Sequence, residues 1–112
     1  KKAEKEKIMA SALKEACQVP LAIMEKGAEI LDIVEILSVK GSVMAVSDAG
    51  VAAQFTRTAV LGASMNVYIN TKTMKDRTLA EEYNEKADRL NAYTSEKADE
   101  IFKKIEEALK CR

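Results

Sequence analysis

The chain has 112 residues, enough for one small domain with a modest core. Lysine and arginine together number 18, as do aspartate and glutamate, so no net charge favours binding to nucleic acid. Histidine, the commonest general base and metal ligand, is absent, and the two cysteines match no metal-binding or CxxC spacing. Composition therefore favours a small domain with reduced thiols and no metal site.

Apolar residues recur at three- and four-residue spacing near the start of the chain, which predicts a helix from Ala3 to Gln18. We expect Pro20 to end this helix, because the residue before a proline is pushed away from helical geometry. A second helix is predicted from Pro20 to about Val39, closed by Gly41. Its acidic residues form one narrow stripe, so we expect this helix to be largely buried.

Small residues mark the third predicted helix, which starts at Ser47 and Asp48 and runs to about Asn70. Its thin surface indicates the central helix of a bundle. A long amphipathic helix follows, where Thr78 and Glu81 fit a capping box. The predicted fold is all-α, a bundle of about four helices with a small-residue-rich central helix and a long C-terminal one.

Residues 41–70 are the longest weakly charged stretch, but Asp48 and Arg57 interrupt it and make it a poor membrane span. No secretory signal pattern opens the chain. With only two cysteines, these features lead us to expect a cytoplasmic protein.

Polar side chains in the third predicted helix are the most informative, because each needs a partner or a ligand if it is buried. Asp48, Asn66 and Asn70 share one helix face, while Arg57 points away and is expected to pair with another helix. Eighteen residues, about 27 Å of helix, separate Asp48 from Asn66, so one small ligand cannot contact both. Asp48 is either a helix cap or a ligand-binding acid. The asparagines either tie the helix end to a neighbouring backbone or bind the amide edge of a heterocycle.

Three short motifs follow one another along the chain. Cys17–Leu21 reads CQVPL, Ala45–Ala53 reads AVSDAGVAA, and Asn66–Lys72 reads NVYINTK. Together they resemble the formiminotetrahydrofolate cyclodeaminase and methenyltetrahydrofolate cyclohydrolase family. The similarity extends from about Ala10 to Leu109.

This resemblance implies an all-helical domain that dimerises and acts on one-carbon derivatives of tetrahydrofolate. The reaction would be either cyclisation of 5-formimino-tetrahydrofolate with ammonia release or hydrolysis of 5,10-methenyl-tetrahydrofolate. Residues 1–112 would form the C-terminal half of the domain, while the missing N-terminal half would carry the catalytic acid. We therefore expect the chain alone to be inactive. Its partner would be a second copy or a chain that supplies the other half, with no nucleic acid or membrane involved.

The resemblance also suggests which residues contact the folate, a substrate rather than a covalently bound cofactor. Asp48, Asn66, Asn70 and Lys72 are the expected substrate-binding residues, with amides suited to the pterin and lysine to the glutamate tail. No catalytic residue and no metal ligand is assigned. The alternative is a noncatalytic helical module that pairs with copies of itself or with a partner chain.

Overall fold

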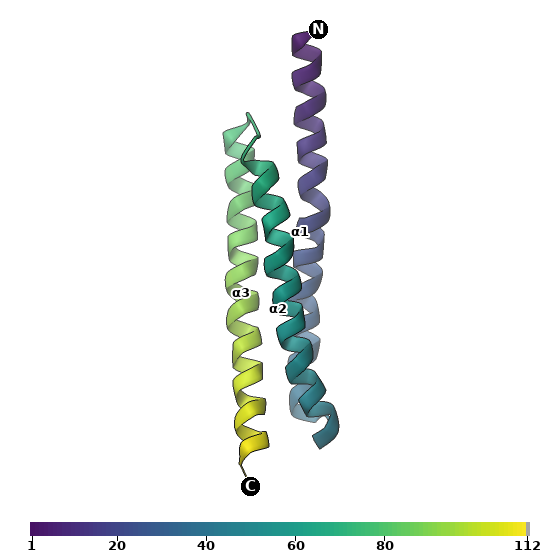
Figure 1. Cartoon of the computed structure of the whole chain (residues 1–112), viewed down its shortest axis with the longest axis vertical. Helices are drawn as coiled ribbons and strands as arrows, with labels where there is room; N and C mark the ends of the chain where they lie inside the picture. The colour runs from purple at the N-terminus through teal and green to yellow at the C-terminus, as the bar shows by residue number, and fades with distance from the viewer. Residues whose placement is uncertain (112) are drawn as a thin grey trace.

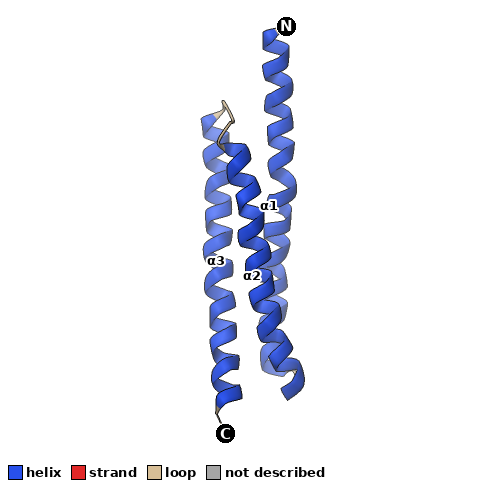
Figure 2. Ribbon diagram, viewed as in Figure 1, coloured by secondary structure: helices blue, strands red, loops and turns tan. Residues whose placement is uncertain are grey.

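The computed structural model describes residues 1–111, apart from the side chains of Val43 and Met44. Three helices account for nearly all of this part of the chain: α1 (Lys2–Lys40), α2 (Val43–Thr71) and α3 (Arg77–Lys110) (Figure 2). They lie side by side in a rod whose Cα atoms extend over 70 × 16 × 15 Å, with α2 antiparallel to both neighbours (Figure 1). The all-α prediction is confirmed, and the described residues contain no strand.

The first two predicted helices form the single helix α1, because Pro20 lies inside it without ending it. The prediction of about four helices was therefore wrong. A proline at position 20 cannot donate to the Ala16 carbonyl, four residues earlier. The amide of Asn70 on α2 donates to that carbonyl instead, at 3.5 Å, and Pro20 itself is buried. Packing against α2 and this replacement bond allow α1 to continue through the proline.

The N-terminus of α2 lies before the predicted one. Ser42 is the cap residue, and its hydroxyl accepts a hydrogen bond from the N–H of Ala45 at 3.3 Å. Asp48 is exposed in the second turn, beyond the free N–H groups of the helix start. The interpretation of Asp48 as a helix cap was therefore wrong.

The start of α3 also differs from the prediction. Asp76 caps this helix, and its carboxylate accepts a hydrogen bond from the N–H of Leu79 at 3.0 Å. Thr78 lies inside the first turn, so the capping box predicted for Thr78 and Glu81 was wrong. The nearby Asp76 is an equally good cap residue, and its position is set by the loop that leaves α2.

Replacing Asp76 by alanine is expected to lower the free energy of unfolding by about 1 kcal/mol, the usual effect of losing an N-cap. Thr78→Ala is the matched control and should change it by less than about 0.5 kcal/mol. Denaturant unfolding of both variants measures the difference. A larger loss for Thr78→Ala than for Asp76→Ala would contradict the observed cap.

The core consists of two clusters along the rod. One lies toward the α2–α3 loop and is built around Cys17, Met24, Val60 and Val67, with Ala80 and Ala87 from α3. The other lies toward the α1–α2 connection and comprises Leu31, Val34, Ala49, Ala53, Ala98, Ile101 and Ile105. α3 is amphipathic as predicted, since its buried residues follow one stripe of a strongly charged helix. α2 supplies small or β-branched residues to both clusters, which lets its neighbours pack closely.

Part of the acidic stripe of α1 contacts α3 at the edge of the bundle, where Glu25, Asp32 and Glu35 stay at least partly exposed. Glu25 pairs with Lys86 at 2.6 Å, and Glu35 pairs with Lys97 at 3.1 Å. Between these pairs, the Tyr93 hydroxyl donates to Asp32 at 2.5 Å. Polar contacts therefore hold α1 against α3.

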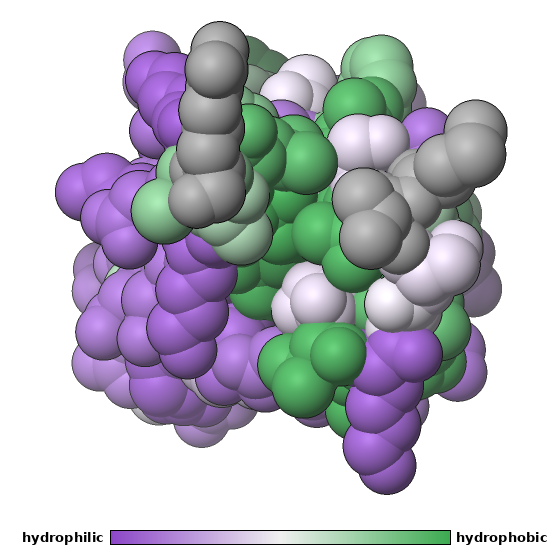
Figure 3. Space-filling view, turned by 90° about the horizontal axis from the view of Figure 1, so that it is seen from below, coloured by the Kyte–Doolittle hydropathy of each residue, from purple (hydrophilic) through white to green (hydrophobic). Residues whose placement is uncertain are grey.

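As a consequence, the apolar side of α1 faces outward, and the prediction that this segment is largely buried was wrong. Val19, Ile23, Ile30 and Ile33 are between 47 % and 66 % exposed. The predicted polar face of α2 also points outward and includes Phe55, which is 72 % exposed. Seen end-on in Figure 3, hydrophilic residues gather on one side of the rod and hydrophobic residues on the other. We call this exposed apolar side of α1 and α2 the outer face.

Candidate functional site

The structure places three of the four predicted substrate-binding residues at one end of the bundle. The Asn70 amide nitrogen donates to the Asn66 backbone carbonyl at 2.7 Å as well as to Ala16. Asp48 lies eighteen residues before Asn66 on the same unbroken helix, about 27 Å along its axis. Lys72 is the C-cap of α2, and its backbone N–H donates to the Tyr68 carbonyl at 3.0 Å. Asn66, Asn70 and Lys72 therefore lie at one end of the bundle, and Asp48 does not.

Ala16, Asn66 and Asn70 form what we call the polar set, where α1 passes the end of α2. The buried Cys17 thiol fixes the register here, since its sulfur lies 3.9 Å from the Val67 carbonyl to which it donates. Asn70 is half-buried, whereas Asn66 is exposed and its side chain forms no hydrogen bond within the described residues. The free Asn66 amide can donate to a ligand and accept from it.

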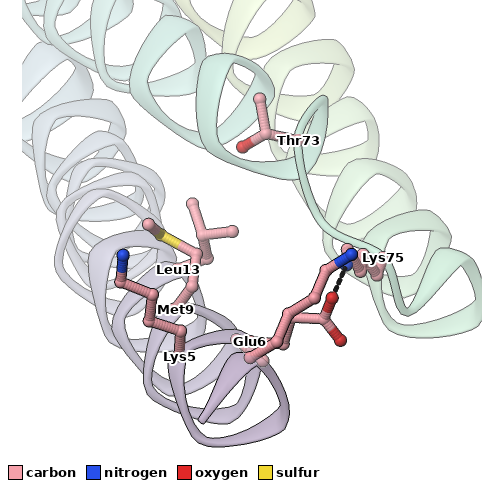
Figure 4. Close-up of a pocket in the computed structure, with 8 residues that line it drawn as sticks. Lys5, Glu6, Met9, Leu13, Thr73 and Lys75 are labelled. Carbon is pink, nitrogen blue, oxygen red and sulfur yellow. Dashed lines mark ion pairs between the residues drawn. The ribbon is translucent and has the colours of Figure 1, made fainter.

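A pocket of about 430 Å³ opens beside the polar set, between the first turns of α1 and the α2–α3 loop (Figure 4). Its walls combine apolar side chains with lysines: Lys2, Lys5, Glu6, Met9, Ala10, Leu13, Thr73 and Lys75. Glu6 and Lys75 face each other across it with an ion pair of 2.8 Å. The hydroxyl of Thr73 donates to the Asn70 carbonyl at 3.3 Å, which links this pocket to the polar set.

An apolar groove of about 420 Å³ lies on the other side of the polar set, between α1 and α2. It is lined by Val19, Ala22, Ile23, Lys26, Gly27, Ile30, Thr56 and Ala59. Residues 9, 13, 16, 19, 23, 27 and 30 recur at helical spacing, so the pocket, Ala16 and the groove share one face of α1. The arrangement can hold an elongated ligand with a hydrogen-bonding part, an apolar part and an anionic end.

A second polar network joins α2 to α3, and no pattern in the sequence indicated it. The Tyr68 hydroxyl donates to Asp88 at 2.5 Å and accepts from the Asn91 amide at 3.4 Å. Burial, then the hydrogen bond and the negative charge of Asp88, raise the pKa of Tyr68 to about 12. Close by, the Thr71 hydroxyl donates to Asn84 at 2.6 Å. This network anchors the end of α2 that carries the asparagines.

Tyr68→Phe is expected to flatten the alkaline loss of stability. The folded pKa of Tyr68, about 12, lies above its ordinary value of 10.0, so the folded chain binds more protons between these values. The contribution of Tyr68 to stability is complete below pH 10 and is lost as pH rises toward 12. Urea unfolding at about pH 9 and about pH 11 measures this loss. Asp88→Asn, which keeps an acceptor without the charge, should remove part of this alkaline loss of stability. An unchanged pH dependence of stability in Tyr68→Phe would contradict the raised pKa of Tyr68.

Other charged contacts serve packing between helices. Arg57 lies 3.8 Å from Asp99 on α3, which confirms the predicted interhelical ion pair. Hydrogen bonds to Glu35 raise the pKa of Lys97, and burial raises the pKa of Cys17.

In residues 1–111, no three metal-ligating side chains cluster closely enough to hold an ion. Nor does this part of the chain contain a helix with the length and hydropathy to cross a membrane.

The fold and these contacts define an all-α domain with a polar set between two apolar recesses. The model of the formiminotransferase-cyclodeaminase family matches residues 1–89, and the chain belongs to this family. Over 71 residues it is 44 % identical to the methenyltetrahydrofolate cyclohydrolase of Methylorubrum extorquens. This match covers 63 % of the chain and 34 % of that protein, so the chain spans about a third of the length of this curated relative. The resemblance noted in the three motifs is confirmed.

Proposed function

We propose that this chain forms the substrate-binding face of a domain that hydrolyses 5,10-methenyl-tetrahydrofolate. The observation that carries the proposal is the polar set of Ala16, Asn66 and Asn70, flanked on one helix face by a lysine-rimmed pocket and an apolar groove. The named activity of the Methylorubrum extorquens relative favours hydrolysis over cyclodeamination of the formimino derivative.

The chemistry of the substrate suits this arrangement. Asn66 and Asn70 offer amide groups to the donor and acceptor edge of the pterin. Met9 and Leu13, both within about 10 Å of Ala16 along α1, offer apolar contact to the aminobenzoyl part. Lys5 and Lys72 are cations for the glutamate carboxylates. Asp48 lies too far along α2 for this role, and we propose that it contacts a different ligand site or a partner.

Hydrolysis adds water to the methenyl carbon, which becomes tetrahedral. The bond from that carbon to N5 then breaks while N5 gains a proton and the added hydroxyl loses one, so the carbon becomes a formyl group on N10. These transfers need a group that removes a proton from water and one that supplies a proton to N5. We assign neither role to a residue of this chain. The proposal places them in the remainder of the family domain, with residues 1–112 as its C-terminal half.

Asn66→Ala tests the proposal, because this side chain is exposed and makes no hydrogen bond within the described residues. We expect about tenfold weaker binding of 5,10-methenyl-tetrahydrofolate by calorimetry, with the free energy of unfolding unchanged. Thr58→Ala, on another face of α2, is the control and should bind normally. Equal affinity in Asn66→Ala and the wild type would contradict the proposed site. In the complete family domain, where the catalytic groups are proposed to lie, loss of methenyl absorbance compared with ammonia release from the formimino derivative distinguishes the two reactions.

The outer face supports the second proposed role, assembly. Its isoleucines and Phe55 stay in water, in addition to the apolar side chains that α1 and α2 bury in the two core clusters. A contiguous exposed apolar surface on two neighbouring helices is typical of a face that packs against another protein segment. We propose that the outer face packs against a second copy or against helices of the rest of the domain.

The free thiols of Cys17 and Cys111 favour a reducing compartment, and we propose the cytoplasm.

A further inference from the structure

We propose that Pro20 and Asn70 act as a pair that gives the polar set two hydrogen-bond acceptors, the Ala16 carbonyl and the Asn70 amide oxygen, which select a ligand edge bearing N–H donors. The ligand class is an amino-substituted heterocycle. The identity of that ligand rests on the proposed function, whereas the pairing of Pro20 with Asn70 rests on geometry alone.

The first acceptor exists because of the proline. In an α-helix the carbonyl of residue 16 accepts from the N–H of residue 20, and proline has no N–H. Pro20 nevertheless lies inside α1, so the Ala16 carbonyl has no N–H of residue 20 to accept from, and the amide of Asn70 on α2 donates to it. Its bond from Asn70 is 3.5 Å, longer than a normal N–H···O bond. A carbonyl oxygen has two lone pairs, so Ala16 can accept a second, shorter bond from a ligand.

The second acceptor is the side-chain oxygen of Asn70, because the nitrogen of the same amide donates to the Ala16 carbonyl. Asn70 lies between two backbone carbonyls, those of Ala16 and Asn66, and donates to both from its amide nitrogen. Only the NH₂ end of an amide can satisfy two carbonyl oxygens, so the Asn70 amide is held in one orientation. Both of its N–H groups are then used. Its oxygen, which has no partner within the described residues, is the group that Asn70 offers to a ligand.

Two fixed acceptors favour an edge that carries amino or ring N–H groups and disfavour an edge of carbonyl oxygens. The neighbouring Asn66 amide has no hydrogen bond within residues 1–111, so it can adapt to either a donor or an acceptor. A 2-amino-4-oxo pyrimidine ring has adjacent N–H donors and one carbonyl oxygen. It matches two acceptors beside one adaptable amide.

A double-mutant cycle with Pro20→Ala and Asn70→Ala, measured on the unfolding equilibrium, tests the pair without any ligand. In the wild-type background, Asn70→Ala leaves the Ala16 carbonyl without a partner and should raise the unfolding equilibrium constant about fivefold. In the Pro20→Ala background the new N–H takes that carbonyl, and Asn70→Ala should raise the constant by less than about twofold. Equal effects in both backgrounds would overturn the pair.

Ligand selection is tested with folic acid and its analogue in which methyl replaces the 2-amino group, both measured by calorimetry. The wild type should bind folic acid about tenfold more tightly than the analogue. This preference should fall to about threefold or less in Pro20→Ala and in Asn70→Ala. It should persist in Gln18→Ala, an exposed neighbour of Pro20 on α1.

The outcomes separate this inference from the proposed function. Folate binding without preference for the amino group, or with the same preference in all variants, overturns the acceptor pair and leaves the folate site standing. If neither compound binds any variant, the proposed function and the ligand assignment both fail. The unfolding cycle still decides in that case whether Asn70 compensates for Pro20.

Discussion

Gly27→Ala is expected to lower the free energy of unfolding by about 2 kcal/mol, although alanine is the better helix former. A Cβ at position 27 would lie 2.3 Å from Cγ2 of Val60, a fully buried and stiff side chain. Such overpacking costs about 3 kcal/mol, which exceeds the helix-propensity gain of about 1 kcal/mol. The close contact between α1 and α2 therefore requires glycine at this position.

Gly62→Ala is the matched control for this substitution. Gly62 is in the middle of α2, and a Cβ there would have no heavy atom within 4 Å. Only the propensity gain remains, so the free energy of unfolding should rise by about 0.5–1 kcal/mol. Denaturant unfolding of both variants gives the comparison. A stabilised Gly27→Ala variant would show that α1 and α2 are further apart than the structure has them.

If the outer face packs against a second copy, as proposed above, the double substitution Ile23→Lys with Phe55→Lys should make the chain monomeric. Ile23 is 48 % and Phe55 72 % exposed on the outer face, so their burial is available only to association. Two such side chains contribute about 4 kcal/mol when buried, and losing them weakens association about a thousandfold. Sedimentation equilibrium across a concentration series measures the change.

Charge alone must be separated from position in that experiment. Ala92→Lys with Thr78→Lys adds the same two charges to exposed positions on α3, opposite its buried stripe. This control should associate like the wild type. A wild-type chain that is monomeric at all concentrations would exclude a second copy as the partner of the outer face. A control that dissociates equally would exclude the outer face as the interface between copies.

Helix periodicity predicted most of this fold, because amphipathic spacing depends on neighbouring residues in the chain. The long α3 and the pair of Arg57 with a residue of another helix followed from spacing alone. The error at Pro20 has a tertiary cause. The compensating donor, Asn70, is fifty-four residues from Ala16 in the sequence. Local rules for proline cannot include such a partner.

The candidate site was predicted in part. The four-residue spacing of Asn66 and Asn70 placed them on one face, and the length of the helix separated Asp48 from them. Ala16 could not be found from side-chain chemistry, because its backbone carbonyl is the group that contacts Asn70. The same applies to Tyr68, whose partner Asp88 belongs to a charged helix face with no distinguishing pattern.

The division of the core into two clusters bears on how the rod moves. Each segment of a helix contacts only the cluster at its own level, so one end of the bundle can open while the other stays closed. The pairing of Pro20 with Asn70 lies at the level of Cys17 and Val67, within the first cluster. Asp48 lies beside Ala49, in the second. Backbone amides at the two ends of α2 therefore need not exchange with solvent as one cooperative unit.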